Sequence, residues 1–129
     1  MNTSDYPTCE QTFATLRIFP ANISSAEITN LLGIRPTSLK HGWFLSSEGQ
    51  VDSVDLRQHI DWVIDQLFAV KDALHKLQYS GSNMDIHCYW LSKYGHGGPT
   101  ISPAQMLILG ELKLELLLDI YPGSNNDNA

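Results

Sequence analysis

Cysteine and histidine are the residues best suited to chemistry in this chain, and one pair of them is adjacent, His87 and Cys88. A cysteine nucleophile needs a base within hydrogen-bonding distance of its sulfur. Residues 84–90 alternate apolar and polar types, which predicts a strand whose neighbouring side chains point to opposite faces. His87 therefore cannot serve Cys88, and we expect Cys88 to be a buried structural thiol. The sequence predicts no catalytic residue.

Metal and phosphate sites are the other chemistry that these residue types could support. The five histidines include no HExxH motif, and the two cysteines form no CxxC motif, so no metal site and no cofactor are predicted. His59 is expected to be a partly buried helix residue rather than a ligand. Segment 95–98 (Gly-His-Gly-Gly) lacks the GxxxxGK[ST] and GxGxxG patterns, so a plain loop is favoured, with anion binding by His96 as the alternative.

Hydrophobic periodicity predicts alternating strands and helices in the order βαβαβαβ. The strands are half polar, which is typical of antiparallel or mixed sheets with one exposed face. We therefore predict an α+β fold, a ferredoxin-like variant, with a four-stranded, mainly antiparallel or mixed sheet and helices packed on one face. The predicted strands are residues 11–19, 41–46, 84–90 and 113–121.

The helices have clear sequence signals. Residues 24–27 and 102–105 have the S-x-x-E/Q form of a capping box, which predicts two helix starts. Between them, an apolar stripe over residues 56–77 recurs at steps of four and three, which predicts a long helix, either continuous or bent near residues 69–70. The stripe suits packing on the domain's own sheet, with a coiled-coil dimer as the alternative.

Composition indicates the domain boundaries. Of 129 residues, 43% are hydrophobic, which is enough for one core without disulfides. Residues 11–122 are predicted to form a single domain, and the polar segments 1–10 and 123–129 are predicted to be flexible. No apolar run is long enough to span a membrane, and two isolated cysteines fit a reducing compartment, so we expect a cytoplasmic protein.

The half-polar strands also predict a recognition surface. If helices cover the face that carries the Leu, Ile and Trp rows, aromatic and ionic side chains collect on the opposite face. That mixture suits a protein partner or a small ligand, and the alternative is a solvated face stabilised by an Arg17–Asp119 pair. The candidate binding residues on this face are Arg17, His87, Tyr89, Asp119 and Tyr121.

A second candidate surface lies on the flank of the long helix. Trp62 falls outside the apolar stripe, near Asp61 and Asp65. An aromatic residue among carboxylates can anchor a binding partner. The alternative is a tryptophan that packs under a loop.

Several short motifs resemble those of a known family. They are residues 31–37 (LLGIRPT), Gly42-Trp43, His59-Ile60 with the apolar positions that follow, and residues 118–121 (LDIY). Together they resemble a group of small bacterial proteins known as a domain of unknown function, number four-two-seven-nine. The resemblance implies a bacterial α+β domain over roughly Thr12 to Tyr121, and it implies no catalytic or binding residue. Such sequences often carry a proline in the middle of the long helix, and this chain does not, so a two-helix division there stays open.

Charge points to the class of partner. The formal charge of −6 at pH 7 repels phosphate backbones and anionic lipids and attracts basic proteins, so nucleic acid and membrane are not expected partners. We expect a non-enzymatic binding module that engages a basic protein, such as an immunity-type inhibitor of a bacterial toxin. Two alternatives stay open: a small-ligand domain or enzyme that uses the polar sheet face with His96, and a structural homodimer joined through the long helix or an edge strand.

Overall fold

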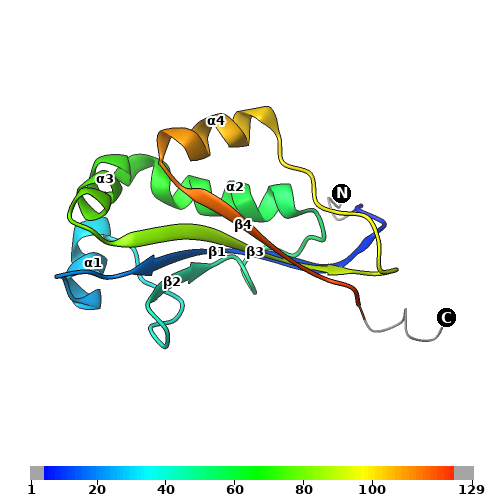
Figure 1. Cartoon of the computed structure of the whole chain (residues 1–129), viewed down its shortest axis with the longest axis horizontal. Helices are drawn as coiled ribbons and strands as arrows, with labels where there is room; N and C mark the ends of the chain where they lie inside the picture. The colour runs from blue at the N-terminus through cyan, green and yellow to red at the C-terminus, as the bar shows by residue number, and fades with distance from the viewer. Residues whose placement is uncertain (1–4, 124–129) are drawn as a thin grey trace.

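Four strands form one mixed sheet in the computed structural model, which describes residues 5–123 (Figure 1). The first strand is antiparallel to the second and third, and the third is parallel to the fourth. The predicted α+β fold with a mainly antiparallel or mixed sheet is therefore confirmed. The strands are β1 (Cys9–Phe19), β2 (Trp43–Ser46), β3 (Asn83–Ser92) and β4 (Glu115–Tyr121), in the spatial order β2-β1-β3-β4.

The fold is a variant of the ferredoxin-like arrangement, from which it differs in the order of its helices and strands along the chain. That arrangement has the order β-α-β-β-α-β, whereas here a helical segment follows each of the first three strands. A parallel pair of strands cannot be joined by a hairpin. The helix α4 (Pro103–Glu111) supplies the crossover that makes β4 parallel to β3.

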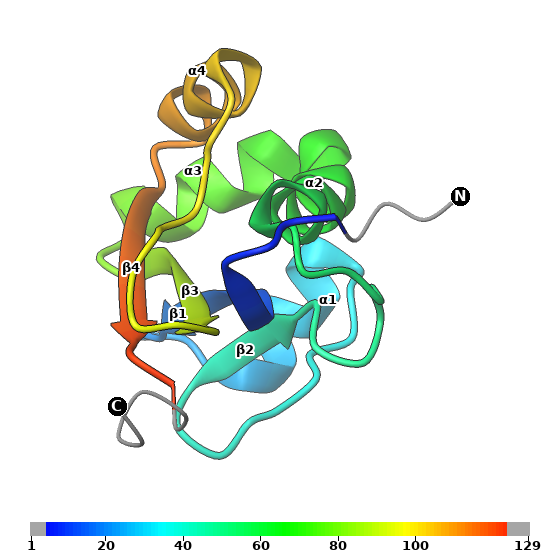
Figure 2. The same ribbon diagram turned by 90° about the vertical axis from the view of Figure 1, so that its right-hand side faces the viewer.

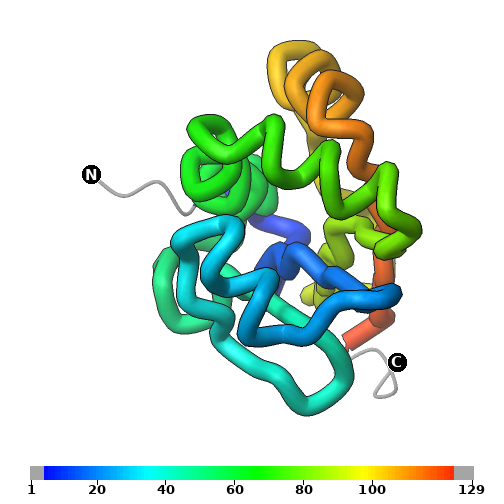
Figure 3. Tube along the Cα trace, turned by 90° about the vertical axis from the view of Figure 1, so that its left-hand side faces the viewer, coloured from blue at the N-terminus to red at the C-terminus, as the bar shows by residue number. Residues whose placement is uncertain are grey.

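The helices lie on one side of the sheet, as predicted, and the sheet curves around them (Figure 2). The apolar rows of the strands and the stripe of the long helix meet in one core, since side chains such as Leu16, Ile86 and Trp90 are fully buried. The tube in Figure 3 shows that α1 (Ser25–Leu32) packs beside the end of the sheet and that the other helices lie above it. Besides α4, the helical segments are α1 (Ser25–Leu32), α2 (Leu56–Leu67), the 3₁₀ turn η1 (Phe68–Val70) and α3 (Lys71–Tyr79).

The long apolar stripe is divided between α2 and α3. Of the two alternatives left by the sequence, the bend near residues 69–70 is the one observed, and it occurs without proline. The 3₁₀ turn redirects the chain, so both halves keep their apolar side on the curved sheet. Leu56, Ile60, Leu67 and Leu74 are all fully buried. The stripe is therefore covered within the monomer and is not free to form a coiled coil.

The N-terminal boundary of the folded region lies earlier than predicted. Cys9 begins β1, pairs with Ser92 and is 4% exposed, and the Tyr6 ring packs edge-on against Trp90. The sequence did not predict these contacts, because Tyr6 and Cys9 stand alone among polar residues and so form no periodic pattern. The remaining predicted flexible residues, 1–4 and 124–129, lie outside the described residues.

The helical cover stops before β4, which corrects one expectation. Leu118 shares the helix side with Ile86, yet it is 41% exposed whereas Ile86 is fully buried. The reason is the position of α4, the helix next to β4, which packs on α2. The side chains of the edge strand on the helix side therefore meet solvent.

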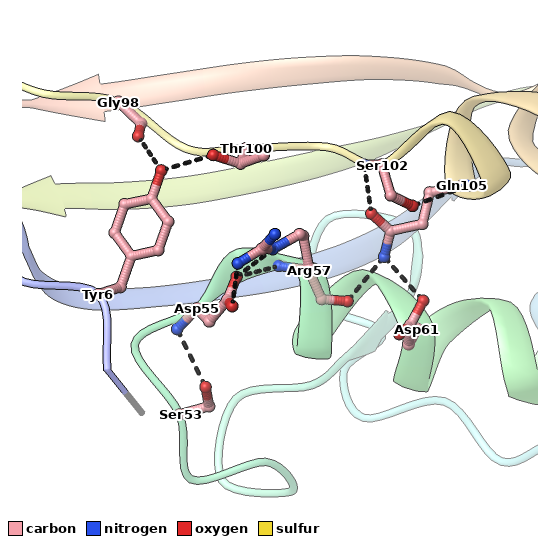
Figure 4. A network of polar contacts seen from close by, with 9 residues as sticks. All are labelled: Tyr6, Ser53, Asp55, Arg57, Asp61, Gly98, Thr100, Ser102 and Gln105. Carbon is pink, nitrogen blue, oxygen red and sulfur yellow. Dashed lines mark hydrogen bonds and ion pairs between the residues drawn. The ribbon is translucent and has the colours of Figure 1, made fainter. Parts of the chain in front are cut away.

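Both predicted capping boxes are present, and the second does more than begin a helix. Its glutamine, Gln105, is 4% exposed and accepts from the Ser102 backbone amide at 3.1 Å. Its amide nitrogen donates to the Arg57 carbonyl and to the Asp61 carboxylate, each at 2.7 Å (Figure 4). One buried side chain thus joins the start of α4 to α2.

Replacing this amide should loosen α4. We expect Gln105→Ala to lower the free energy of unfolding by about 2 kcal/mol, because two acceptors on α2 lose a donor and the cap loses one bond. Ser102→Ala removes only the cap, with an expected loss of about 1 kcal/mol. Urea unfolding followed by tryptophan fluorescence measures both, and equal losses would show that the link to α2 contributes nothing.

Candidate functional site

The uncovered side of the sheet, which we call the open face, is the candidate site. Strand register places polar and aromatic side chains of all four strands on it in transverse rows. Arg17 lies opposite Phe44 and Asp85, for example, and Tyr89 lies opposite Asp119. All five candidates predicted for this face lie on it. Its central members are Phe13, Thr15, Arg17, Phe44, Ser46, Asp85, His87, Tyr89, Glu115, Leu117, Asp119 and Tyr121.

An ion pair neutralises the guanidinium of the open face. Arg17 Nη2 lies 2.6 Å from Asp85 Oδ2, and Arg17 Nε lies 2.8 Å from Asp85 Oδ1. The hydrogen bonds to Asp85 raise the pKa of Arg17 above its ordinary value. The predicted pairing of Arg17 with Asp119 is wrong, because β3 lies between β1 and β4 and places Asp85 directly opposite Arg17.

The Asp119 carboxylate instead contacts two side chains, one from β3 and one from β4. His87 Nε2 lies 3.0 Å from Asp119 Oδ2, and the Tyr121 hydroxyl donates to the same oxygen at 3.3 Å. The negative charge of Asp119 raises the pKa of Tyr121. The Asp119 side chain keeps 36% of its surface exposed, so its carboxylate can also accept from a bound molecule.

Three aromatic rings form a continuous row across β1, β3 and β4. Phe13 stacks on Tyr89 with ring centroids 5.0 Å apart, and Tyr89 meets Tyr121 at 5.3 Å. The row ends beside Asp119, whose carboxylate accepts a hydrogen bond from the Tyr121 hydroxyl. A planar or cationic group that binds here would therefore meet ring faces and a carboxylate together.

A hollow of about 560 Å³ lies over the β1–β2 half of the open face. Arg17 and His87 line it, so two of the predicted residues converge there. Sequence reasoning missed the contribution of β2, although the alternation of Trp43 and Leu45 with Phe44 and Ser46 carried that signal. The lining residues are Phe13, Thr15, Arg17, Thr37, Ser38, Phe44, Ser46, Glu48 and His87.

Negative charge dominates this surface. The open face carries one guanidinium, Arg17, and three carboxylates, Asp85, Glu115 and Asp119, and Glu48 adds a fourth carboxylate at the rim of the hollow. Because Asp85 already pairs with Arg17, the other three carboxylates set the local potential.

His96 does not join this site. Its ring stacks near Tyr94 at 6.0 Å in the loop after β3, and it does not line the hollow. Tyr6 anchors this loop, because its hydroxyl donates a hydrogen bond to the Gly98 carbonyl and lies 2.8 Å from Thr100 Oγ1 (Figure 4). The structure therefore gives no support to the combination of His96 with the sheet residues.

The residues of the second candidate surface point in different directions. Trp62 is half-buried, packs against the core and lines a shallow hollow with Arg35 and Pro36, so it packs under a loop. Asp61 turns toward α4 and accepts from Gln105 (Figure 4). Asp65 stays exposed. No ring-and-carboxylate cluster forms on this flank.

A serine–histidine pair that the sequence did not reveal lies in the core. The Ser47 hydroxyl is 2.6 Å from His59 Nδ1, and His59 Nε2 donates to the Ser53 carbonyl at 2.8 Å. The partners assign the Nε2–H tautomer, so Ser47 donates to Nδ1. Ser47 is fully buried and also accepts from the Ala14 amide at 2.9 Å. This pair fastens β1 to the start of α2, and its hydroxyl cannot reach a substrate.

Cys88 and His87 lie on opposite sides of the sheet, as the alternation of β3 predicted. Cys88 is fully buried on the core side, and His87 points to the open face. Within residues 5–123, no group of three or more His, Cys, Asp and Glu side chains is arranged to hold a metal ion. No helix of that part of the chain has the length and apolar character required to cross a membrane.

One family model matches this chain. It is the domain of unknown function DUF4279, and the match covers residues 37–123, which include β2, β3 and β4 with their contribution to the open face. Comparisons with curated proteins and with solved structures produced no match. Because the family model spans more than half of the chain, this protein belongs to the DUF4279 family, as its sequence motifs implied.

Proposed function

We propose that this protein is a non-enzymatic binding module whose open face engages a basic protein partner. The observation that carries the proposal is the row of rings Phe13, Tyr89 and Tyr121, which ends at the half-exposed carboxylate of Asp119. A lysine or arginine side chain laid along this row would meet ring faces and an anion, both of which attract cations.

Electrostatics supports the same class of partner. The guanidinium of Arg17 is held by Asp85, so the open face presents carboxylates without a free guanidinium to repel a basic protein. The formal charge of the whole chain, −6 at pH 7, speeds encounter with such a protein and opposes binding of nucleic acid or anionic lipid.

A tetra-arginine peptide is a direct probe of the open face, and tetra-glutamate is its charge-reversed control. We expect ¹H–¹⁵N NMR titration with tetra-arginine to shift amide signals of β1, β3 and β4. Asp119→Asn should weaken binding about fivefold, since an exposed charge pair contributes up to about 1 kcal/mol. Tyr121→Ala should weaken it by a similar factor through loss of the ring contact.

Asp65→Asn is the matched control, because it removes one exposed carboxylate from the flank of α2. It should leave the affinity of tetra-arginine unchanged. Equal losses of affinity in Asp65→Asn and Asp119→Asn would show that the effect of Asp119 arises from net charge alone. Shifts centred on α2 would assign binding to the other surface and contradict the proposal.

Within this class, we propose an immunity-type inhibitor of a bacterial toxin, acting in the reducing cytoplasm. Size, acidity and two unpaired buried cysteines support this. Co-expression of this protein with a basic bacterial toxin that it binds should restore growth of the host, and Tyr121→Ala should reduce the rescue. Equal rescue by both proteins would contradict the use of the open face.

A small-ligand role is the second candidate, and the hollow over β1 and β2 is what favours it. Part of its polar lining already has partners within the protein, because the Thr15 hydroxyl donates to Ser46 and Arg17 pairs with Asp85. A metabolite that raises the Tm of the protein, but not that of Ser46→Phe with its hollow filled, would support this role over the first.

A further inference from the structure

The two edges of the sheet differ in how they are protected. β2 is four residues long, and its outer side is bridged by Ser38, which exchanges backbone hydrogen bonds with Phe44. β4 is seven residues long and, within residues 5–123, pairs only with β3. It contains no lysine, proline or bulge, three of the features that keep an edge strand from pairing with another chain, and its two charged residues are Glu115 and Asp119.

Exposed apolar side chains concentrate beside this edge. Twelve large hydrophobic residues are exposed among those described, and six of them belong to β4 and α4. Both sides of the edge strand contribute, because Leu117 and Tyr121 lie on the open face and Leu118 and Ile120 on the helix side. The α4 contribution is Met106, 55% exposed, and Leu107, 67% exposed.

The exposed side of α4 is suited to close approach by another helix. Gly110 lies one turn after Met106 and Leu107, and a Cβ placed on it would meet no atom within 4 Å. Gly110 is the next-to-last residue of α4 and has no side chain, so another helix can approach the backbone there. Figure 2 shows α4 on the helix side of the sheet, at the β4 edge.

We propose that β4 is the pairing strand of a homodimer in which two copies meet antiparallel about Leu118. This edge adjoins the row of rings and shares Asp119 and Tyr121 with it, but the pairing uses the outer backbone of β4 and a second copy of the chain, so it goes beyond the proposed function. The dimer would extend the sheet to twice its width, supply partners for the outer hydrogen-bonding groups of β4, and bring the exposed sides of the two α4 helices together.

Charge and strand length together select this register, because centres at Leu116 or Ile120 would pair only the end of β4. With Leu118 opposite Leu118 of the second copy, Leu117 faces Asp119 and Glu115 faces Tyr121, so no like charges are opposed. Moving the centre to Leu117 would set Glu115 against Asp119, and moving it to Asp119 would oppose two aspartates. Like charges directly opposite destabilise strand pairing. The strand is thus self-complementary about one residue, which is the argument for a second copy as the occupant.

Disulfide trapping tests both the strand and its register. Opposite residues of an antiparallel pair have Cα atoms about 4.5 to 5.5 Å apart, within the range that a disulfide needs. Mild oxidation should therefore convert Leu118→Cys to a covalent dimer. Glu115→Cys should stay uncrosslinked, because the two substituted positions would lie roughly 20 Å apart along the strands. The native thiols Cys9 and Cys88 are buried and do not compete.

Mass in solution provides the second readout. By light scattering across the micromolar range, the wild-type protein should have twice the mass of one chain, and Leu118→Lys should be monomeric. Phe68→Lys is the control, since Phe68 is 63% exposed on η1, which is not part of this edge. A monomeric wild-type protein would overturn the proposal. A dimer that persists in Leu118→Lys, or a crosslink in Glu115→Cys alone, would overturn the assigned surface or register.

Discussion

Ellman's reagent should modify the two thiols about a hundredfold more slowly in the folded protein than in urea-unfolded protein. Burial raises the pKa of the Cys9 thiol from 9.0 to about 11, and it raises the pKa of the fully buried Cys88 thiol to about 12. The reactive thiolate is therefore scarce at neutral and mildly alkaline pH, and the reagent cannot reach the sulfur atoms.

Absorbance at a mildly alkaline pH, followed with and without urea, makes this measurement. Cys88→Ser separates the two rates, and we expect slow modification of the remaining Cys9. A thiol that reacts as fast in the folded protein as in urea would contradict the structural role of that cysteine. It would also reopen the enzyme alternative, because a reactive cysteine is a nucleophile.

Acid should destabilise the protein through His59. Burial lowers the pKa of this side chain below its ordinary value, and the Ser47 hydroxyl donates to its Nδ1. The folded state therefore binds fewer protons than the unfolded state at mildly acidic pH. Stability should be complete above the unfolded pKa of about 6.5 and should be lost as the pH falls through the lower folded pKa.

Two substitutions at this position separate hydrogen bonding from titration. His59→Gln can accept from Ser47 and donate to the Ser53 carbonyl, so it should keep most of the stability and lose this part of the pH dependence. His59→Leu leaves both partners unsatisfied in the core and should lower the free energy of unfolding by about 3 kcal/mol.

Urea unfolding at pH values on both sides of the histidine range measures these effects, with His41→Gln as an exposed control. The control should follow the wild-type pH dependence. Identical pH dependence for wild type and His59→Gln would show that this histidine does not carry the acid lability. A small loss in His59→Leu would show that the buried network contributes little to stability.

The sequence determined the features that depend on local spacing. Alternation in β3 predicted Ile86, Cys88 and Trp90 on the core side and His87 and Tyr89 on the open face, because successive strand residues point to opposite faces. Capping boxes predicted the starts of α1 and α4, since their hydrogen bonds join residues three positions apart. The same local rules predicted the α+β class with helices packed on one face of the sheet, but the sequence left open which face the helices cover.

Only the tertiary structure decided which of these residues meet. Periodicity says which side chains share a face but not which strands are neighbours, so it could not choose Asp85 over Asp119 as the partner of Arg17. The order β2-β1-β3-β4 depends on the path of the chain between strands, and that order also leaves β4 at an uncovered edge with Leu118 in solvent. Burial of His59 beside Ser47 likewise arises from packing between distant elements, for which residue spacing carries no signal.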